Sequence, residues 1–252
     1  MPEKNIIVNG LNVHFYQSEE LNCDGPVIFL HGWGSQASHL KSVFEKSENF
    51  IALDLPGFGM SERPSSVWTT AEYADFLRDF LLKLSISKPV LVGHSFGGSI
   101  IIKYCASHKD VEKIILIGSA GIRKKSSRLV MYKTGARIFN SLLSLPVLKK
   151  IKHYLRRKFY TFIGSEDYLD AGEMKDIFQK VINDDLTEEL KRLDVETVMI
   201  WGEEDKETPI SDANNMHELI RKSKLFVISG AGHYVFLDNK DAFNKIFFEQ
   251  LP

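Results

Sequence analysis

The chain has 252 residues, of which 44% are hydrophobic, and a formal net charge of −1. This length predicts one domain with a large core, and the near-zero charge argues against nucleic acid or an anionic membrane as a general partner. The first residues lack a basic segment followed by an apolar stretch, and no apolar run reaches the roughly 20 residues of a membrane span, so we expect a cytoplasmic protein.

The first 34 residues predict a hairpin followed by a buried strand. Residues 6–8 and 13–16 are strand formers that flank Asn9-Gly10, a dipeptide typical of two-residue hairpin turns. Residues 27–30 form a short and wholly apolar run, as in a strand that is covered on both faces. The run ends at His31-Gly32-Trp33-Gly34, where the two glycines allow a tight loop.

Apolar strand runs and helical segments then alternate along the chain. The expected strands are residues 50–54, 89–93, 113–118, 197–201 and 224–229. The expected helices are residues 37–47, 70–84, 96–107, 211–221 and 239–249. Because the strand runs are continuously apolar rather than alternating, we expect them to be buried on both faces. The pattern predicts an α/β fold in which helices flank a mostly parallel sheet.

The segment 121–193 breaks this alternation, because it has helical patterns without a convincing buried strand. We predict that it is a helical cap inserted into a core domain of residues 1–120 and 194–252. Residues 123–158 contain many basic and no acidic side chains, whereas the charged side chains of residues 166–194 are mostly acidic. Two interpretations stay open: the two halves pair with each other or are solvated, or the basic segment 123–158 binds an acidic partner.

Residues 93–98, Gly-His-Ser-Phe-Gly-Gly, carry the pattern with the clearest chemical meaning. They join a strand run to a helical segment, which places Ser95 on a sharp strand-to-helix turn. Side chains two positions before and after that serine would collide with the tight backbone, and Gly93 and Gly97 remove them. Ser95 is therefore a candidate nucleophile, although serine also favours the ordinary N-cap position of a helix.

A serine nucleophile needs a histidine base that a carboxylate holds in the right tautomer. His233 follows the strand run 224–228, and Asp205 follows the run 197–201. The neighbouring Glu203, Glu204 and Glu207 leave the identity of the acid open. For the oxyanion that forms when serine attacks, we expect the donors to be the backbone amides of Phe96 and Trp33.

Other polar side chains near these positions are expected to be structural. We expect His31 and Asp54 to order the loops that follow their strands, and His94 to pack away from Ser95. Cys23 and Cys105 lie far apart and lack the spacing of a metal site, so reduced thiols are predicted.

Five blocks of the chain occur in the order found in the α/β-hydrolase superfamily, and the chain resembles its serine hydrolases from near residue 5 to near residue 250. The blocks are residues 31–34, 54–61, 93–98, 201–205 and 230–233. The resemblance implies a triad of Ser95, Asp205 and His233, because the acid in this family lies three residues after the glycine at 202. It also implies an acyl-enzyme and no metal or organic cofactor. A haloalkane dehalogenase or epoxide hydrolase would carry an aspartate in place of Ser95.

We therefore expect a carboxylesterase-type serine hydrolase that acts on small to medium acyl esters. The same residues leave open a thioesterase or carrier-protein methyl-ester esterase, a lactonase, and a hydrolase of carbon–carbon bonds in aromatic ring-cleavage products. A non-catalytic or slow ligand-binding receptor on the same fold is the alternative of another class.

Overall fold

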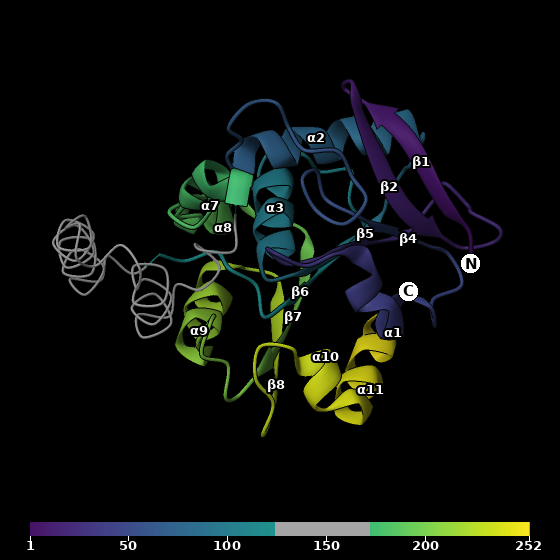
Figure 1. The fold of residues 1–252 in the computed structure, drawn as a ribbon. Helices are drawn as coiled ribbons and strands as arrows, with labels where there is room; N and C mark the ends of the chain where they lie inside the picture. The colour runs from purple at the N-terminus through teal and green to yellow at the C-terminus, as the bar shows by residue number, and fades with distance from the viewer. Residues whose placement is uncertain (124–171, 252) are drawn as a thin grey trace, which may run out of the picture.

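The computed structural model describes residues 1–123 and 172–251, and an eight-stranded sheet forms its centre (Figure 1). The strand order is β1-β2-β4-β3-β5-β6-β7-β8. The strands are β1 (Glu3–Val8), β2 (Leu11–Gln17), β3 (Val27–Leu30), β4 (Phe50–Leu53), β5 (Val90–His94), β6 (Lys113–Ile117), β7 (Glu196–Gly202) and β8 (Ser223–Ile228). The β1–β2 and β2–β4 pairs are antiparallel, and the other pairs are parallel. The predicted mostly parallel α/β sheet is confirmed.

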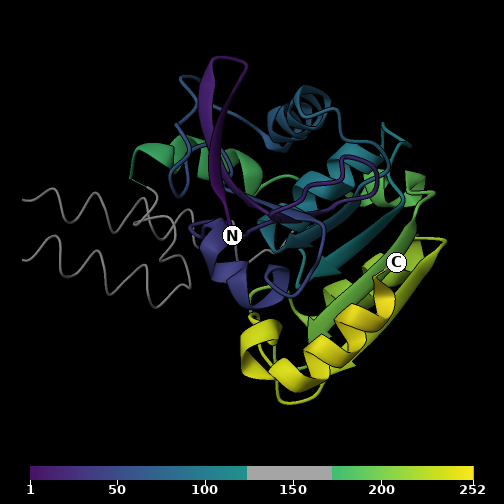
Figure 2. The same cartoon turned by 90° about the vertical axis from the view of Figure 1, so that its right-hand side faces the viewer.

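Helices cover both faces of the sheet, as Figures 1 and 2 show from two directions. They are η1 (Ala37–Leu40), α1 (Lys41–Phe44), α2 (Thr70–Lys83), α3 (Phe96–Cys105), η3 (Gly172–Met174), α7 (Lys175–Val181), α8 (Thr187–Arg192), α9 (Ile210–Leu219), α10 (Val235–Asp238) and α11 (Lys240–Gln250). Buried residues of α2, α3, α8 and α9 belong to one apolar cluster, and those of α1, α10 and α11 to a second.

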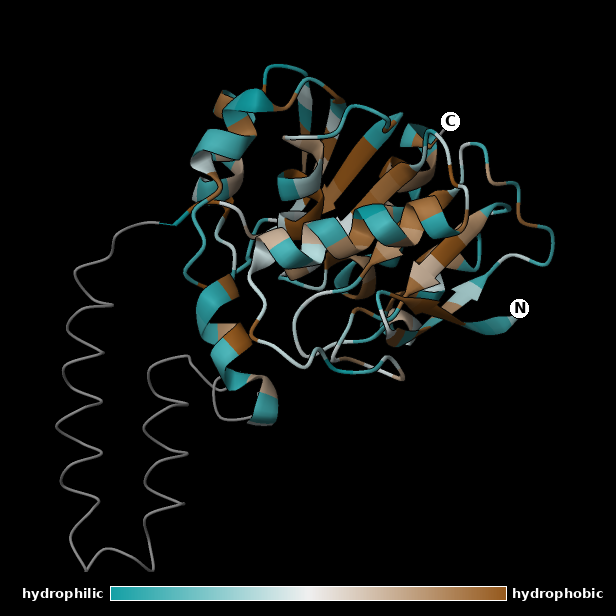
Figure 3. Cartoon of the chain, turned by 90° about the horizontal axis from the view of Figure 1, so that it is seen from above, coloured by the Kyte–Doolittle hydropathy of each residue, from teal (hydrophilic) through white to brown (hydrophobic). Residues whose placement is uncertain are grey.

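The central strands contribute side chains to both apolar clusters. In β5, Leu91 packs into the first cluster, whereas Val90 and Val92 pack into the second. Successive side chains of a strand point to opposite faces, so a strand between two cores must be apolar at every position. Figure 3 shows this as strands coloured hydrophobic along their length, next to helices of mixed hydropathy.

Strand β8 corrects one expectation, because the apolar run 224–228 is not a buried strand. It lies at the edge of the sheet and pairs only with β7. Val227 is 45% exposed, and within the run only Ile228 is buried. An edge strand has a neighbour on one side only, and its faces are covered only as far as the flanking helices reach.

Most of the predicted cap 121–193 and of the basic segment 123–158 lies outside the described residues. The parts that are described, η3, α7 and α8, place Met174, Ile177 and Leu190 in the same apolar cluster as α2 and α3. The division into a core domain and a cap therefore stays a prediction. Among the helices that the structure describes, none has the length and apolar character needed to cross a membrane.

Candidate active site

Ser95 lies between the end of β5 and the start of α3, in a strained backbone conformation. Its φ of 51° and ψ of −112° are in a region that residues with a side chain rarely adopt. Hydrogen bonds hold this conformation: the Ser95 amide donates to the carbonyl of Ile117 at 3.0 Å, and the Ser95 carbonyl accepts from the amide of Gly98 at 3.0 Å. The side chain of Ser95 is thus presented at the carboxyl end of the sheet.

The two glycines that flank Ser95 are required by close backbone contacts. A Cβ atom on Gly93 would lie 2.6 Å from the carbonyl carbon of Gly97, and one on Gly97 would lie 2.3 Å from the carbonyl oxygen of Leu30. Neither neighbour is the end of a flexible side chain, so a substitution would push backbone segments apart. The need for small residues here is as the sequence predicts.

Asp205 and His233 come from the loops after β7 and β8 and form a buried pair. His233 Nδ1 lies 2.8 Å from Asp205 Oδ2, and the two residues are 7% and 5% exposed. The amides of Glu207 and Thr208 each donate to Asp205 Oδ1 at 2.9 Å, and the Thr208 hydroxyl lies 2.8 Å from Oδ2. Burial opposes ionisation of Asp205, but the contacts with His233 and Thr208 outweigh it, so the pKa of this carboxyl lies below its ordinary value.

Backbone contacts between these two loops explain why the pair forms. The amide of Glu204 donates to the carbonyl of Ala231 at 2.9 Å, and a Cβ atom on Gly202 would lie 2.2 Å from the carbonyl oxygen of Gly232. Trp201 Nε1 donates to the carbonyl of Thr208 at 2.7 Å, which closes the acid loop, residues 203–209. Because Gly202 has no side chain, the acid loop can contact the loop after β8 that carries His233.

His94 and His31 hold the loops around Ser95, as expected from their positions. His94 Nε2 lies 3.1 Å from the carbonyl oxygen of His233, to which it donates. His31 Nδ1 donates to the carbonyl of Gly32 at 2.7 Å, and its Nε2 accepts from the amide of Leu55 at 3.0 Å. Burial lowers the pKa of His94 to about 3 and that of His31 to about 4, so both rings are neutral near pH 7.

The two predicted oxyanion donors lie on segments next to Ser95. Phe96 is the first residue of α3, where an amide has no partner within the helix. A Cβ atom on Gly32 would lie 3.2 Å from Ser95 Cβ, so the loop that carries Trp33 runs against the serine side chain. In residues 1–123 and 172–251, no hydrogen bond from the amide of Trp33 or Phe96 is found. Their role stays a prediction.

An aromatic cluster lies beside these donors. The indole of Trp33 packs against Phe58, Phe96 and Phe178, with ring centroids 4.9, 5.6 and 5.0 Å apart. Phe178 belongs to α7, so this cluster joins the loop after β3 to the helices that follow the segment 124–171.

The outer nitrogen of His233 contacts a residue that the sequence does not single out for this role. His233 Nε2 lies 3.3 Å from Glu207 Oε2, whereas no hydrogen bond joins it to Ser95 in the described part of the chain. The Glu207 side chain is 59% exposed. A hydrogen bond between a nucleophile and its base is often long before substrate binds and shortens in the complex with substrate. The only sequence signal for Glu207 is its place two residues after Asp205.

Asp54 forms a second buried pair with a histidine, His14. Asp54 Oδ2 lies 2.9 Å from His14 Nδ1, and the carboxylate accepts from the amides of Ala37 at 2.7 Å and Met60 at 3.0 Å. A Cβ atom on Gly59 would lie 2.2 Å from Asp54 Oδ2. Asp54 thus orders the loop after its strand, as expected, but the sequence gives no sign of His14.

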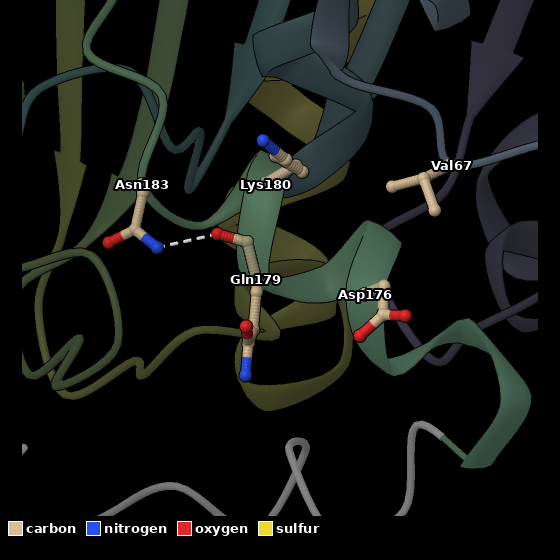
Figure 4. Close-up of a pocket in the computed structure, with 5 residues that line it drawn as sticks. All are labelled: Val67, Asp176, Gln179, Lys180 and Asn183. Atoms are coloured by element: carbon tan, nitrogen blue, oxygen red, sulfur yellow. Dashed lines mark hydrogen bonds between the residues drawn. The ribbon is translucent and has the colours of Figure 1, made fainter.

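A pocket of about 570 Å³ lies beside α7, and its lining includes none of Ser95, Asp205 and His233 (Figure 4). Its lining is Val67, Asp176, Gln179, Lys180 and Asn183. Figure 4 shows the side-chain amide of Asn183, which follows α7, bonded to the backbone carbonyl of Gln179. No His, Cys, Asp or Glu cluster that suits a metal ion is found in the described ranges.

Comparisons with known proteins agree with this fold. The model of the alpha/beta hydrolase family matches residues 27–246. The AB hydrolase superfamily protein YisY of Bacillus subtilis (strain 168) is 27% identical, with 90% of this chain and 92% of that protein covered.

Two solved structures have a similar fold. A meta-cleavage product hydrolase from Pseudomonas fluorescens IP01 has a TM-score of 0.71 and 24% identity, and covers 98% of this chain and 96% of its own. An esterase from Exiguobacterium antarcticum has a TM-score of 0.73 and 22% identity, with 98% of each chain covered. Because the family model spans most of the chain and includes Ser95, Asp205 and His233, the chain belongs to the alpha/beta hydrolase family.

Proposed function

We propose that this protein hydrolyses carboxylic esters of small to medium acyl substrates through an acyl-enzyme on Ser95. The observation that carries the proposal is the buried Asp205–His233 contact of 2.8 Å beside a serine on a strained turn. An aspartate on Nδ1 fixes the tautomer in which Nε2 is free to accept a proton. His233 is then the base for Ser95, and Asp205 stabilises the imidazolium that forms.

The mechanism proceeds by two acyl transfers. Ser95 Oγ attacks the ester carbonyl carbon while His233 Nε2 takes the serine proton. The amides of Phe96 and Trp33 stabilise the oxyanion, and each such donor is worth about 10²- to 10³-fold in turnover. His233 returns the proton to the alcohol as the C–O bond breaks. A water molecule, deprotonated by His233, then attacks the acyl-enzyme, releases the acid and regenerates Ser95.

The aromatic cluster around Trp33 favours an apolar acyl group. Trp33 lies in the loop that runs against Ser95, and its ring packs against Phe58, so an acyl chain bound there would make hydrophobic contacts. Burying an acyl chain there would be favourable by about 0.8 kcal/mol for each CH₂ group. This supports a neutral acyl ester over a short polar one.

Hydrolysis of carbon–carbon bonds in ring-cleavage products is the second candidate. The similarity to a meta-cleavage product hydrolase favours it. The same serine, histidine and acid would serve this reaction. A thioester, a carrier-protein methyl ester, a lactone, or simple ligand binding stay as alternatives, and a bound acidic partner on residues 123–158 has no support among the described residues.

Covalent labelling with a fluorophosphonate tests the mechanism without knowledge of the substrate. We expect labelling of Ser95, located by mass spectrometry of the labelled peptide, and its loss in Ser95→Ala and His233→Ala. Ser35→Ala is a matched control that should leave the labelling unchanged. Ser35 Oγ lies 3.0 Å from His39 Nδ1, but among the described residues no carboxylate is hydrogen-bonded to His39, and Ser35 does not have a positive φ. If labelling persists undiminished in His233→Ala, the proposed mechanism is overturned. The alternative of a non-catalytic or slow ligand-binding receptor then remains.

A substrate panel separates the reactions that share these residues. Nitrophenyl esters of increasing acyl length, a thioester, a lactone and a ring-cleavage product are compared by kcat/KM. We expect the highest value for a neutral ester. A ring-cleavage product turned over faster than every ester would replace the proposal with the second candidate.

A further inference from the structure

We propose that Gly118 is a positioning residue for this hydrolysis: the segment 117–120 holds the backbone of Ser95 and also packs against the Asp205–His233 pair, and it fits there because Gly118 has no side chain. The inference rests on the proposed function of Ser95 and His233. Gly118 has no group that reacts, so it acts through the residues that it places.

The segment 117–120, which begins at the last residue of β6, holds the backbone of Ser95 through two hydrogen bonds. The Ser95 amide donates to the carbonyl of Ile117 at 3.0 Å, and the amide of Ala120 donates to the carbonyl of Ser95 at 3.2 Å. The Ala120 carbonyl accepts in turn from the hydroxyl of Ser99, in α3, at 2.8 Å. The end of the neighbouring strand therefore helps to hold Ser95 in its strained conformation.

Gly118, which lies between these two contacts, packs against the Asp205–His233 pair. A Cβ atom on Gly118 would lie 3.3 Å from Asp205 Oδ2, from His233 Nδ1 and from the carbonyl oxygen of His233. The first two are the atoms that meet at 2.8 Å in the pair. Since 3.3 Å is closer than ordinary van der Waals contact, a side chain at this position would displace the pair.

Hydrogen bonds oppose a shift of Gly118 away from the pair. Its amide donates to the carbonyl of Ile200, in β7, at 3.1 Å, and its carbonyl oxygen lies 3.0 Å from the hydroxyl of Thr208. Its φ of 48° lies in the left-handed region, which glycine adopts without steric cost. The position of Gly118 is thus fixed by β7 and the acid loop, and a side chain there has to be accommodated by Asp205 and His233.

This placement matters because the proton transfer needs Ser95 Oγ and His233 Nε2 within hydrogen-bond reach. Ser95 follows β5 and His233 follows β8, and β6 and β7 lie between these strands in the sheet. The segment 117–120 contacts both residues, so it sets how far apart they lie. A displacement of about 1 Å in such a site can lower the rate by about 10²-fold.

The test compares Gly118→Ala with the unaltered protein on the best ester of the panel. We expect kcat to fall by about 10- to 100-fold and KM to stay within about threefold, because the pair acts on the reacting atoms rather than on ester binding. Gly25→Ala is the matched control, since Gly25 has a φ of 72° and a Cβ atom there would meet no atom of the described residues within 4 Å. It adds a comparable backbone strain far from the pair and should leave both constants unchanged.

A second variant and a second readout separate positioning from a general loss of structure. Gly118→Asn places the same Cβ atom, and asparagine adopts a positive φ more readily than alanine. The midpoint of urea unfolding shows that each variant is folded under the assay conditions. Proton NMR then follows the hydrogen on His233 Nδ1, which the carboxylate of Asp205 deshields. We expect this resonance to move in both Gly118 variants and to stay in place in Gly25→Ala.

The outcomes separate the two proposals. If a fluorophosphonate does not label Ser95 of the unaltered protein, the proposed function fails and this inference fails with it. If Ser95 is labelled and the kcat of a folded Gly118 variant stays within about threefold of the unaltered value, the inference about Gly118 alone is overturned. A rise in KM without a fall in kcat overturns it as well, and so does an equal fall in Gly25→Ala.

Discussion

Two buried aspartate–histidine pairs occur in this chain, and their geometry is nearly the same. Asp205 and His233 meet at 2.8 Å, and Asp54 and His14 meet at 2.9 Å, in both cases between Oδ2 and Nδ1. Each aspartate follows a strand of the sheet, and each also accepts hydrogen bonds from two backbone amides. A close aspartate–histidine contact is therefore not by itself the mark of a catalytic site.

The two pairs differ at the other nitrogen of the ring. His14 Nε2 is buried and has no hydrogen-bond partner among the described residues, and a carboxylate oxygen of Glu3 lies 3.8 Å away. His233 Nε2 instead lies 3.3 Å from Glu207 Oε2. His233 is in the loop after β8, and its ring lies 4.7 Å from that of His94, the residue before Ser95. The outer nitrogen of His233 thus lies near an exposed side chain, whereas His14 lies in β2, between β1 and β4.

The amides that the two aspartates accept also differ in origin. Asp205 accepts from its own acid loop, at Glu207 and Thr208, so its bonds shape one short loop. Asp54 accepts from Ala37 and Met60, which belong to separate segments, and His14 belongs to β2. The Asp54 pair thus joins three segments, and we expect it to contribute to stability rather than to chemistry.

The largest effect should come from changing the aspartate of the Asp205–His233 pair to asparagine. Asp205→Asn keeps the size of the side chain but favours the wrong histidine tautomer, so turnover should fall by as much as ~10⁴-fold. Steady-state kinetics on the best ester of the panel measures this, and the circular dichroism spectrum should stay unchanged. A loss below about tenfold would assign the role of the acid to a neighbouring glutamate and end the distinction between the pairs.

Asp54→Asn should lower stability instead. The amide cannot accept all three donors that the carboxylate accepts, and a buried donor without a partner costs about 1–3 kcal/mol. We expect the free energy of unfolding in urea to fall by about 2–4 kcal/mol, and the labelling rate of Ser95 to stay within about threefold at 20 °C. A catalytic loss as large as that of Asp205→Asn in a variant of unchanged stability would contradict a structural role.

Thr208→Val should give the smallest effect and refine the description of the Asp205–His233 pair. It removes the hydroxyl that donates to Asp205 Oδ2 at 2.8 Å and leaves both amide donors to Oδ1 in place. Losing such a bond costs about 1 kcal/mol, so kcat should fall by roughly 3- to 10-fold. Thr197→Val is the control, since the Thr197 hydroxyl donates to the carbonyl of Val195 and does not touch the pair. Equal effects of the two variants would show that Thr208 acts only through packing.

Much of the fold could be predicted from the sequence, because its signals are local. The continuous apolar runs of β3 to β7 follow from burial on both faces, and the Asn9-Gly10 turn follows from backbone preference. The edge position of β8 could not be predicted, because Leu225, Phe226 and Val227 are as apolar as residues of a central strand. The strand at the edge of the sheet is set by the order of the strands, and the sequence of a single strand does not show that order.

For the candidate site, the sequence by itself determined the residue types and the strained turn. Ser95 needs glycines at 93 and 97, and the backbone contacts that enforce them come from Gly97 in the turn itself and from Leu30 at the end of the neighbouring strand β3. Only the tertiary structure decided which side chains meet: His14 with Asp54, His94 with the His233 carbonyl, and Glu207 with His233 Nε2. Local backbone geometry is set by nearby residues. Contacts between side chains depend in addition on register, loop packing and rotamer, which the chain reaches only once the whole sheet is assembled.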